Sequence, residues 1–310
     1  MGRTALVTGA EGFVGRVLCA RLADDGWRVL RTDRRAPETP EADYLACDLT
    51  DPAPVRTLAE WAADAAVVFH LAAAASVAES FAAAAAYLRI NTGGVIHLAG
   101  AMRAAMPYAR LLYVGSAEAY GPPRALPVSE DHPLCPENPY AVSKAAADHY
   151  CACLSRAGML DVVRLRPFNH SGPGQTDRFA LPAFARQVAA IEAGKQLPVL
   201  RTGNLEARRD FLHVRDVVRA YALAAEKGVS GGVYNICSGR AESMGALLEM
   251  MRRAARVPFE ITPDPARMRP VDIPELRGDN SRLRNDTGWT PRVTPEELVG
   301  ELLDHWRARA

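Results

Sequence analysis

Short apolar runs alternate with longer amphipathic stretches over the first two-thirds of the chain. The apolar runs occupy residues 5–7, 28–30, 66–70, 110–114 and 161–165, and stretches with helical periodicity occupy about 12–25, 80–103 and 139–157. Continuous apolar runs are typical of strands that are covered on both faces of a sheet. Because strands separated by helices of this length form right-handed crossovers, the pattern predicts an α/β fold with a doubly wound parallel sheet.

The character of the sequence changes at Pro167. Beyond it, Pro, Gly and Arg become frequent, and turn signals such as 172–174 and 263–265 separate shorter elements. The run 232–236 again has the composition of a core strand and is expected to return to the sheet. We therefore predict one domain formed by residues 1–166 with about 210–238, and a smaller C-terminal lobe formed by about 167–209 with 239–310.

A glycine-rich loop lies between the first predicted strand and the first predicted helix. Gly9, Gly12 and Gly15 form a G-x-x-G-x-x-G pattern there. Glycines at this spacing allow a tight turn and a close approach of the backbone to a pyrophosphate, which then meets the N–H groups at the helix start. The larger domain is therefore predicted to bind a dinucleotide, as Rossmann-type domains do.

Asp33 follows the second predicted strand, 24 residues after Gly9. A carboxylate at this place binds the ribose hydroxyls of the adenosine and repels a 2′-phosphate, which favours NAD. Arg34 and Arg35 come next and are able to hold a 2′-phosphate, so NADP stays open. A further short strand is expected between residue 35 and Asp48, which makes it the third in the chain. Asp48 follows it and is placed to reach the adenine, with an ordinary helix-entry role as the alternative.

One tyrosine and one lysine share a face of the helix predicted over residues 139–157. Tyr140 and Lys144 are four residues apart, and Ser116 lies 24 residues before the tyrosine, at the end of a predicted strand. A cation beside a phenol is expected to lower its pKa and so to help proton transfer. Only three of the 37 basic residues are lysines, which makes the position of Lys144 more informative. Serine, tyrosine and lysine can then surround a carbonyl or an alcohol at a nicotinamide.

Charge and composition narrow the functional classes to which the protein can belong. With 37 basic and 36 acidic side chains the formal charge is +1, which excludes a strongly basic nucleic-acid binder. The longest apolar stretch, 65–78, is shorter than the roughly 20 residues that span a bilayer, and the N-terminus enters a predicted strand at once, so we expect no signal peptide. The six cysteines lack paired metal-binding spacing. We expect a cytoplasmic protein with reduced thiols and no metal, and with neither nucleic acid nor membrane as a partner.

Several motifs resemble the extended short-chain dehydrogenases/reductases that act on nucleotide sugars. They are the glycine loop, the Tyr140/Lys144 pair, and the segments 70–73, 91–92, 115–121 and 209–216. Longer segments, 168–175, 203–211, 234–239 and 269–289, are similar to the GDP-4-dehydro-6-deoxy-D-mannose reductases. The resemblance covers essentially the whole chain. It implies NAD(P)H-dependent reduction of the C4 ketone of a GDP-4-keto-6-deoxy-hexose, giving a product of the GDP-D-rhamnose type.

The resemblance also implies roles for single residues. It makes Ser116, Tyr140, Lys144 and Glu118 the catalytic group. The implied cofactor contacts, besides the three glycines, are Phe13, Val14, Asp33, Arg34, Asp48, Leu49, Leu71, Ala72, Ala73, Asn91, Tyr140, Lys144 and Pro167. The implied contacts to a nucleotide-diphosphate sugar, favoured to be a GDP-sugar, are Ser116, Glu118, Asn169, Asn204, Arg209 and Arg269. The two arginines would clamp the diphosphate, and a homodimer would pack through the helices near 80–103 and 139–157.

The sequence departs from parts of the wider family. Ala117 stands where the dehydratases of dTDP-glucose carry Asp, which disfavours their elimination of water. Related GDP-mannose dehydratases use a glutamate at the position of Glu118 as a base. In the reductases, the glutamate at this position is expected to make only a structural hydrogen bond. An NAD-dependent C4 epimerase of a nucleotide sugar and a 4-keto reductase of a related GDP-heptose stay open as alternatives. A non-catalytic dinucleotide sensor is disfavoured, because it would be expected to lack the serine, tyrosine and lysine.

Overall fold

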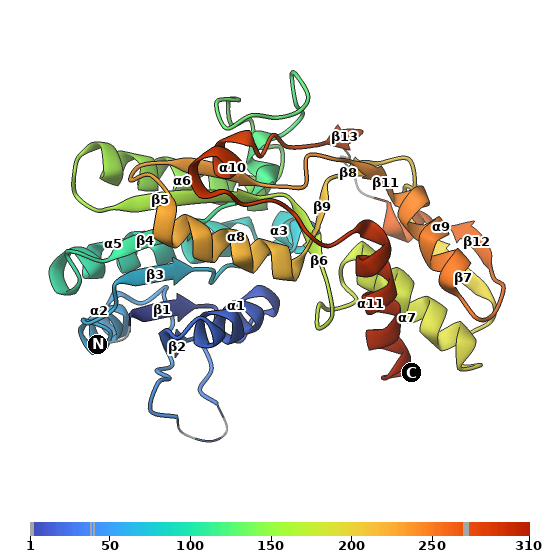
Figure 1. The fold of residues 1–310 in the computed structure, drawn as a ribbon, viewed down its shortest axis with the longest axis horizontal. Helices are drawn as coiled ribbons and strands as arrows, with labels where there is room; N and C mark the ends of the chain where they lie inside the picture. The colour runs from blue at the N-terminus through green and yellow to red at the C-terminus, as the bar shows by residue number, and fades with distance from the viewer. Residues whose placement is uncertain (1–2, 38, 40, 269–272) are drawn as a thin grey trace.

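The computed structural model describes residues 3–37, 39, 41–268 and 273–310. Within these ranges, six parallel strands form the main sheet, in the spatial order β10-β5-β4-β3-β1-β2 (Figure 1). The strands are β1 (Thr4–Thr8), β2 (Arg28–Thr32), β3 (Val67–His70), β4 (Arg110–Val114), β5 (Val162–Pro167) and β10 (Val233–Ile236). The predicted doubly wound parallel sheet is confirmed.

The chain reverses its direction of winding between β1 and β3. From β1 it moves outward to β2, where Arg31 pairs with Tyr44 in a single parallel bridge, and it then returns to β3 on the other side of β1. The third strand expected before Asp48 is therefore reduced to that bridge. Ligands of open α/β sheets bind at the carboxyl ends of the strands where the order reverses, which places the candidate crevice at the ends of β1 and β3.

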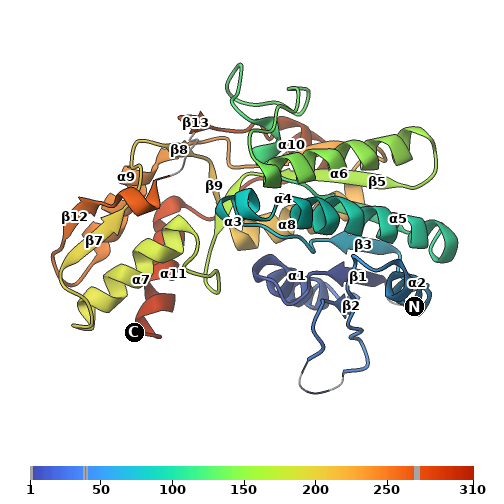
Figure 2. The ribbon, with the colours of Figure 1, turned by 180° about the vertical axis from the view of Figure 1, so that it is seen from behind.

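Three helices cover each face of the sheet (Figures 1 and 2). One face carries α2 (Pro52–Trp61), α5 (Gly94–Ala105) and α6 (Pro139–Arg156), and the other carries α1 (Phe13–Asp24), α8 (Val214–Lys227) and α10 (Ser281–Thr287). Successive strand residues point to opposite faces. Accordingly Leu6 lies in the first core, whereas its neighbours Ala5 and Val7 lie in the second.

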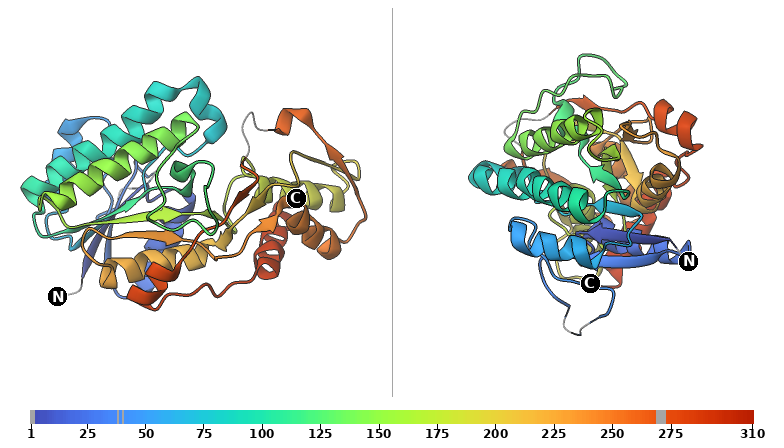
Figure 3. Two further views of the ribbon diagram at one scale, coloured as in Figure 1. Left: turned by 90° about the horizontal axis from the view of Figure 1, so that it is seen from above. Right: turned by 90° about the vertical axis from the view of Figure 1, so that its left-hand side faces the viewer.

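A smaller lobe lies at one end of the sheet domain (Figure 3). Its helices are α7 (Ala180–Glu192), α9 (Met244–Ala254) and α11 (Pro295–Arg307); its short strands are β7 (Val199–Thr202) with β12 (Glu260–Pro263), and β8 (Arg208–Arg209) with β11 (Glu242–Ser243) and β13 (Glu275–Leu276). Phe184, Leu247 and Leu302 belong to a separate core here. A capping box formed by Thr294 and Glu297 begins α11.

Parts of the chain beyond residue 239 pack on the sheet domain and not on the smaller lobe. Helix α10 packs against α8 and β10, and both Leu283 and Trp289 are fully buried in the core between α1 and α8. The indole N–H of Trp289 donates to the carbonyl of Asp216. This segment departs from the predicted division of the chain, which otherwise stays a prediction. A short pair, β6 (Asn169–Ser171) with β9 (Phe211–His213), lies between the two parts.

The single helix predicted over 80–103 is interrupted. The structure has α3 (Val77–Ala82), α4 (Ala84–Tyr87), a π-helical segment η1 (Leu88–Gly93), and then α5. The break falls at Ala83, whose φ of −134° is not helical. Alanine composition gave no signal for this break. Two 3₁₀ segments, η2 (Ala117–Tyr120) and η3 (Pro265–Arg267), complete the elements of the described ranges, and no helix among them is long and apolar enough to cross a membrane.

Candidate active site

The glycine loop lies close against the segment that follows β3. Gly9 has φ of +67°, and a Cβ there would lie 2.8 Å from the backbone nitrogen of Ala72. A Cβ on Gly15 would collide with the carbonyl oxygen of Gly9. Gly12 precedes α1, and no side chain caps the first N–H groups of that helix. The loop therefore has the close packing and the exposed donors that fit a pyrophosphate.

Asp33 is held against the glycine loop. One of its carboxylate oxygens accepts a hydrogen bond from the backbone N–H of Glu11 at 3.2 Å, and the other accepts from the N–H of Arg34 at 2.7 Å. The carboxylate thus lies at the carboxyl end of β2, beside the loop, where a ribose can reach it. The Arg34 side chain is exposed, so the structure leaves NAD and NADP both open.

Asp48 and Leu49 form the turn that leads into α2. The Asp48 carboxylate accepts from the backbone N–H of Thr50 at 2.9 Å and from its hydroxyl at 2.8 Å, and these bonds lower the pKa of the carboxyl group. The carbonyl of Leu49 bonds the ring of His97 at 2.9 Å. These contacts give Asp48 a role in the turn before α2, which is capped by Asp51, and contact with an adenine stays a prediction for both residues.

The loop after β3 carries Leu71, Ala72 and Ala73 along the sheet edge and is tied down by Asn91. The side-chain oxygen of Asn91 accepts from the N–H of Ala74 at 2.8 Å, and its amide nitrogen donates to the Ala74 carbonyl and to the Ser143 hydroxyl. Asn91 is almost fully buried. Its side chain therefore joins the loop to α6, and any effect on a cofactor would act through that loop.

Ser116 and Tyr140 meet at the end of β4. Ser116 caps η2, where its hydroxyl accepts from the N–H of Glu118 at 3.2 Å, and it lies close enough to the phenol of Tyr140 to lower the pKa of that group. Burial raises the pKa of Tyr140 to about 12, while Ser116 opposes the rise. The expectation that Lys144 lowers this pKa is therefore wrong for the structure as it stands, because loss of solvent outweighs other effects.

Lys144 is buried one helical turn beyond Tyr140. Its Nζ donates to the carbonyl of Val114 at 2.8 Å and lies 5.5 Å from the centre of the Tyr113 ring. Burial lowers the pKa of Lys144 to about 8. The Val114 carbonyl is the one hydrogen-bond acceptor that the described residues give this ammonium group. An ammonium has three donors, so Lys144 is suited to bind the hydroxyls of a ribose.

Glu118 lies on the same turn as Ser116. Its carboxylate accepts from the side chain of Asn138 at 3.5 Å, and its charge contributes to raising the pKa of Tyr140. Asn138 also caps α6 by accepting from the N–H of Ala141 at 2.8 Å. The sequence interpretation missed Asn138, although an asparagine directly before a helix that begins with proline is a recognisable cap. These contacts favour a structural role for Glu118.

Three other predicted cofactor contacts lie on α1 and at the end of β5. The Phe13 ring stacks on His170, with centroids 6.3 Å apart and planes inclined by 6°. Val14 is partly buried against the core of α1 and α8, and Pro167 ends β5, where it pairs with Ile236. Phe13 therefore links the glycine-loop helix to β6, which carries Asn169.

The predicted substrate contacts lie on β6 and in the smaller lobe. Asn169 is partly buried, and its side chain makes no hydrogen bond with the described residues. The Asn204 side chain accepts from the N–H of Glu206 at 2.9 Å. Arg209 is buried and donates to the carbonyl of Ile273 at 2.6 Å. Arg269 lies outside the described residues, so the paired arginine clamp stays a prediction.

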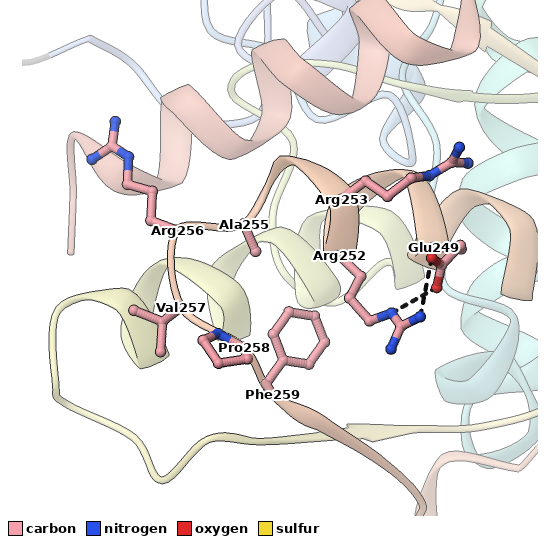
Figure 4. A pocket seen from close by; sticks show the side chains of 8 residues that line it. All are labelled: Glu249, Arg252, Arg253, Ala255, Arg256, Val257, Pro258 and Phe259. Atoms are coloured by element: carbon pink, nitrogen blue, oxygen red, sulfur yellow. Dashed lines mark hydrogen bonds and ion pairs between the residues drawn. The ribbon is translucent and has the colours of Figure 1, made fainter.

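Two pockets of the described surface lie apart from the predicted catalytic residues. One, of about 360 Å³, lies at the end of α9, where Arg252 pairs with Glu249 and Phe259 forms a wall (Figure 4). A larger one, of about 590 Å³, lies between α1 and β2 and touches the glycine loop at Ala10 and Glu11. None of the predicted catalytic residues lines either pocket. The catalytic group is instead defined by its contacts at the sheet edge.

Comparisons with known proteins give consistent results. A family model described as GDP-mannose 4,6 dehydratase matches residues 6–302. The chain is 37% identical to a GDP-6-deoxy-D-mannose reductase of Pseudomonas aeruginosa, over 100% of this chain and 99% of that protein. The structure of RMD from Pseudomonas aeruginosa complexed with NADPH has a TM-score of 0.87 and 35% identity, and covers 99% of this chain and 100% of that one.

The similarity extends to epimerases of the same fold. The structure of Thermus thermophilus UDP-glucose 4-epimerase in complex with NAD has a TM-score of 0.85 and 28% identity, with coverage of 99% of this chain and 100% of that one. Both NADPH and NAD thus occur among the bound cofactors of similar structures.

Proposed function

The chain belongs to the GDP-mannose 4,6 dehydratase family of extended short-chain dehydrogenases/reductases, which act on nucleotide sugars, and from that premise we propose that it reduces the C4 ketone of a GDP-4-keto-6-deoxy-hexose. The observation that carries the proposal is the buried phenol of Tyr140, which lies beside Ser116 at the sheet edge that also holds the glycine loop. The full-length similarity to a reductase supports reduction over the other reactions of the family.

A nicotinamide dinucleotide fits the residues at this edge. When bound in its reduced form, it supplies a hydride to the carbonyl carbon. The loop of Gly9 to Gly15 would hold the pyrophosphate, Asp33 the adenosine ribose, and Lys144 the hydroxyls of the other ribose. Asp33 favours NADH, and the NADPH complex of a similar reductase supports the phosphorylated cofactor.

Tyr140 acts as the proton donor in this proposal. Because the pKa of its phenol is about 12, the group is protonated at neutral pH, and it gives its proton to the oxygen of C4 as negative charge develops there. The Ser116 hydroxyl hydrogen-bonds the same oxygen and orients it. Lys144, one turn away on α6, would hold the ribose and so keep the nicotinamide beside this phenol.

The substrate is a nucleotide-diphosphate sugar, with a GDP-sugar favoured. Arg209 would bind the diphosphate, because a guanidinium offers two parallel donors to phosphate oxygens. Asn169, on β6 beside the stacked pair of Phe13 and His170, would bind the sugar or its diphosphate. Asn204 would contact the nucleotide, and Glu118 would orient the turn that carries Ser116.

An NAD-dependent C4 epimerase is the second candidate, because an epimerase with bound NAD has closely similar structure and Asp33 suits a tightly held NAD. In that reaction the same tyrosine removes and returns a proton, and the cofactor is regenerated. A reductase of a related GDP-heptose differs only in the size of the sugar.

We also propose that two copies of the chain form a homodimer in the cytoplasm. Leu88, Ile96 and Val142 are exposed apolar residues on η1, α5 and α6, which cover the same face of the sheet. Packing of these helices against a second copy would remove the three side chains from water. All six cysteines are free, which supports a reducing compartment.

A substrate panel tests the proposed reaction. The 4-keto sugars carried on GDP, UDP and dTDP are each incubated with NADH and with NADPH, and oxidation of the cofactor is followed by absorbance. We expect the GDP-linked 4-keto-6-deoxy sugar to give the highest kcat/KM and one sugar alcohol per cofactor oxidised. Protein that is purified with NAD already bound, and that converts sugars without consuming reduced cofactor, would instead establish the epimerase.

A further inference from the structure

A buried chain of polar side chains runs beneath the catalytic group. It begins at Asp148, which follows Tyr140 and Lys144 on the inward face of α6. Its carboxylate accepts two hydrogen bonds from the guanidinium of Arg166 on β5, each 2.9 Å long, and a third from Arg164 at 2.9 Å. Figure 2 shows α6 lying along β5, which allows this pairing.

Tyr120 continues this chain into the catalytic turn. The Nη1 of Arg166 donates to the Tyr120 hydroxyl at 3.0 Å, and that hydroxyl donates to the side-chain oxygen of Asn235 on β10 at 2.7 Å. The side chains of Tyr120 and Asn235 are fully buried, and Arg166 is 4% exposed. One hydroxyl group thus connects η2 to α6 through Arg166 and Asp148, and to the edge strand of the sheet through Asn235.

The other end of this row of hydrogen-bonded side chains, at Asn235, is also fixed. The Asn235 amide donates to the carbonyl of Val128 at 2.8 Å, while its backbone N–H donates to the carboxylate of Glu130 at 2.9 Å. The Glu130 carbonyl in turn accepts from Arg166 at 3.1 Å. A hydrogen-bond network in which each member has a partner is rigid, and its loss leaves buried polar groups unpaired.

We propose that Tyr120 is a positioning residue: its hydroxyl holds η2, and with it the Ser116 hydroxyl, in place against the helix that carries Tyr140. This inference rests on the proposed function, because it assigns the turn a part in orienting the C4 oxygen. Tyr120 is the last residue of the 3₁₀ turn that begins directly after Ser116. A shift of the turn would therefore move the serine relative to the phenol, and small misplacements of a catalytic group reduce rates strongly.

The contribution of the Tyr120 hydroxyl can be tested separately from that of its ring. The ring packs in a small core with Phe168, Val128 and Leu276, and the guanidinium carbon of Arg166 lies 5.0 Å from its centre. Burial raises the pKa of Tyr120 to about 12, so the hydroxyl stays protonated and able to donate. Tyr120→Phe keeps the ring and removes only the two hydrogen bonds.

Tyr234→Phe is the matched control. Tyr234 is also fully buried, and its hydroxyl also makes two hydrogen bonds, accepting from the N–H of Val229 and donating to Asp286 at 2.7 Å. It precedes Asn235 on the same strand, but its partners lie away from the catalytic turn. Both variants lose one buried hydroxyl with two partners, so a general loss of stability affects them alike.

The test combines kinetics with hydrogen exchange. We expect Tyr120→Phe to lower kcat about tenfold and to leave the KM for the nicotinamide cofactor within about twofold of wild type. Tyr234→Phe should retain the wild-type kcat. In a Ser116→Ala background, Tyr120→Phe should lower kcat by less than about twofold, because the positioned hydroxyl is already gone. Equal losses in the two backgrounds would overturn the inference.

Amide hydrogen exchange measures the same effect without any reaction. Tyr120→Phe should increase exchange at residues 117–121 about tenfold relative to Tyr234→Phe. Unchanged exchange there would overturn the positioning role even if the substrate were wrongly identified. If wild type reduced no 4-keto sugar while the turn still loosened, the proposed function alone would fail.

Discussion

The catalytic edge of the sheet domain and the end of α9 place their charged side chains in opposite ways. In the sheet domain, Lys144 and Arg166 are buried and bonded to partners on neighbouring elements. At the end of α9 in the smaller lobe, Arg252 is exposed and pairs only with the nearby Glu249 among the described residues (Figure 4). An exposed pair contributes little to stability, whereas a buried charge is costly unless its partners hold it in place. Buried cations therefore identify where this protein fixes its chemistry.

The largest expected effect comes from removing the proton donor. Tyr140→Phe should lower kcat by roughly 10³-fold, since positioned acid catalysis contributes about 10² to 10⁴. Cofactor affinity, measured by fluorescence titration, should change less than about threefold because the phenol is not a main cofactor contact. Wild-type turnover in this variant would remove Tyr140 from the reaction.

Lys144→Met should lower kcat about 10²-fold and also weaken cofactor binding, because the ammonium group is expected to serve both. It should also change the pH dependence of stability. The pKa of Lys144 is about 8 in the folded protein, against 10.5 for an ordinary lysine. Between these values the unfolded chain binds more protons at this residue, so its contribution to the free energy of unfolding rises with pH.

Denaturant titration at several pH values measures that contribution. From pH 8 to 10.5 the stability of wild type should rise relative to Lys144→Met, by about 3 kcal/mol at most. Taking the difference cancels the titration of the tyrosines, which both proteins share. A constant difference over this range would show that Lys144 is not desolvated as described.

A smaller effect is expected at Arg209 in the other lobe. Arg209→Lys keeps the charge but loses the two parallel donors, so the KM for the nucleotide sugar should rise about tenfold with little change in kcat. Arg252→Lys, on the exposed end of α9, is the control and should leave the KM unchanged. A similar KM in both variants would argue against a diphosphate contact by Arg209.

Loss of the proposed dimer should have the smallest effect on activity. Ile96→Asp places a charge on the exposed face of α5 and should convert the protein to a monomer in sedimentation experiments. Its effect on kcat should be less than about threefold, because Ile96 points away from the sheet that carries the site. A wild-type sample that sediments as a monomer would contradict the dimer itself.

The sequence predicted those parts of the site whose partners lie close in the chain. The glycine loop and the Tyr140/Lys144 pair depend on spacing within one turn or one helix, and the parallel sheet follows from apolar runs between helices. By contrast, Asp148 and Arg166 pair across α6 and β5, and their pairing depends on how the helix lies on the sheet. Only the two arginines within an otherwise apolar strand hinted that a buried carboxylate must be near.

Other misses have similar causes. The break at Ala83 leaves no trace in a run of alanines, because alanine suits a continuous helix equally well. Helix α10 packs on the sheet domain because Trp289, which follows it, is buried in the core beside α1 and α8. That burial depends on the packing of the whole fold and not on the local sequence. The pKa of Tyr140 was misjudged because spacing predicts the neighbouring charge but not the loss of solvent.

Isotope transfer tests the central claim most directly. The protein is incubated with a GDP-4-keto-6-deoxy-hexose and with NADH or NADPH that carries deuterium at C4 of the nicotinamide, and the product is examined by NMR. Our account predicts deuterium at C4 of the sugar, in a single configuration, with one cofactor oxidised per sugar. A product without deuterium at C4, formed while the reduced cofactor is not consumed, would contradict it.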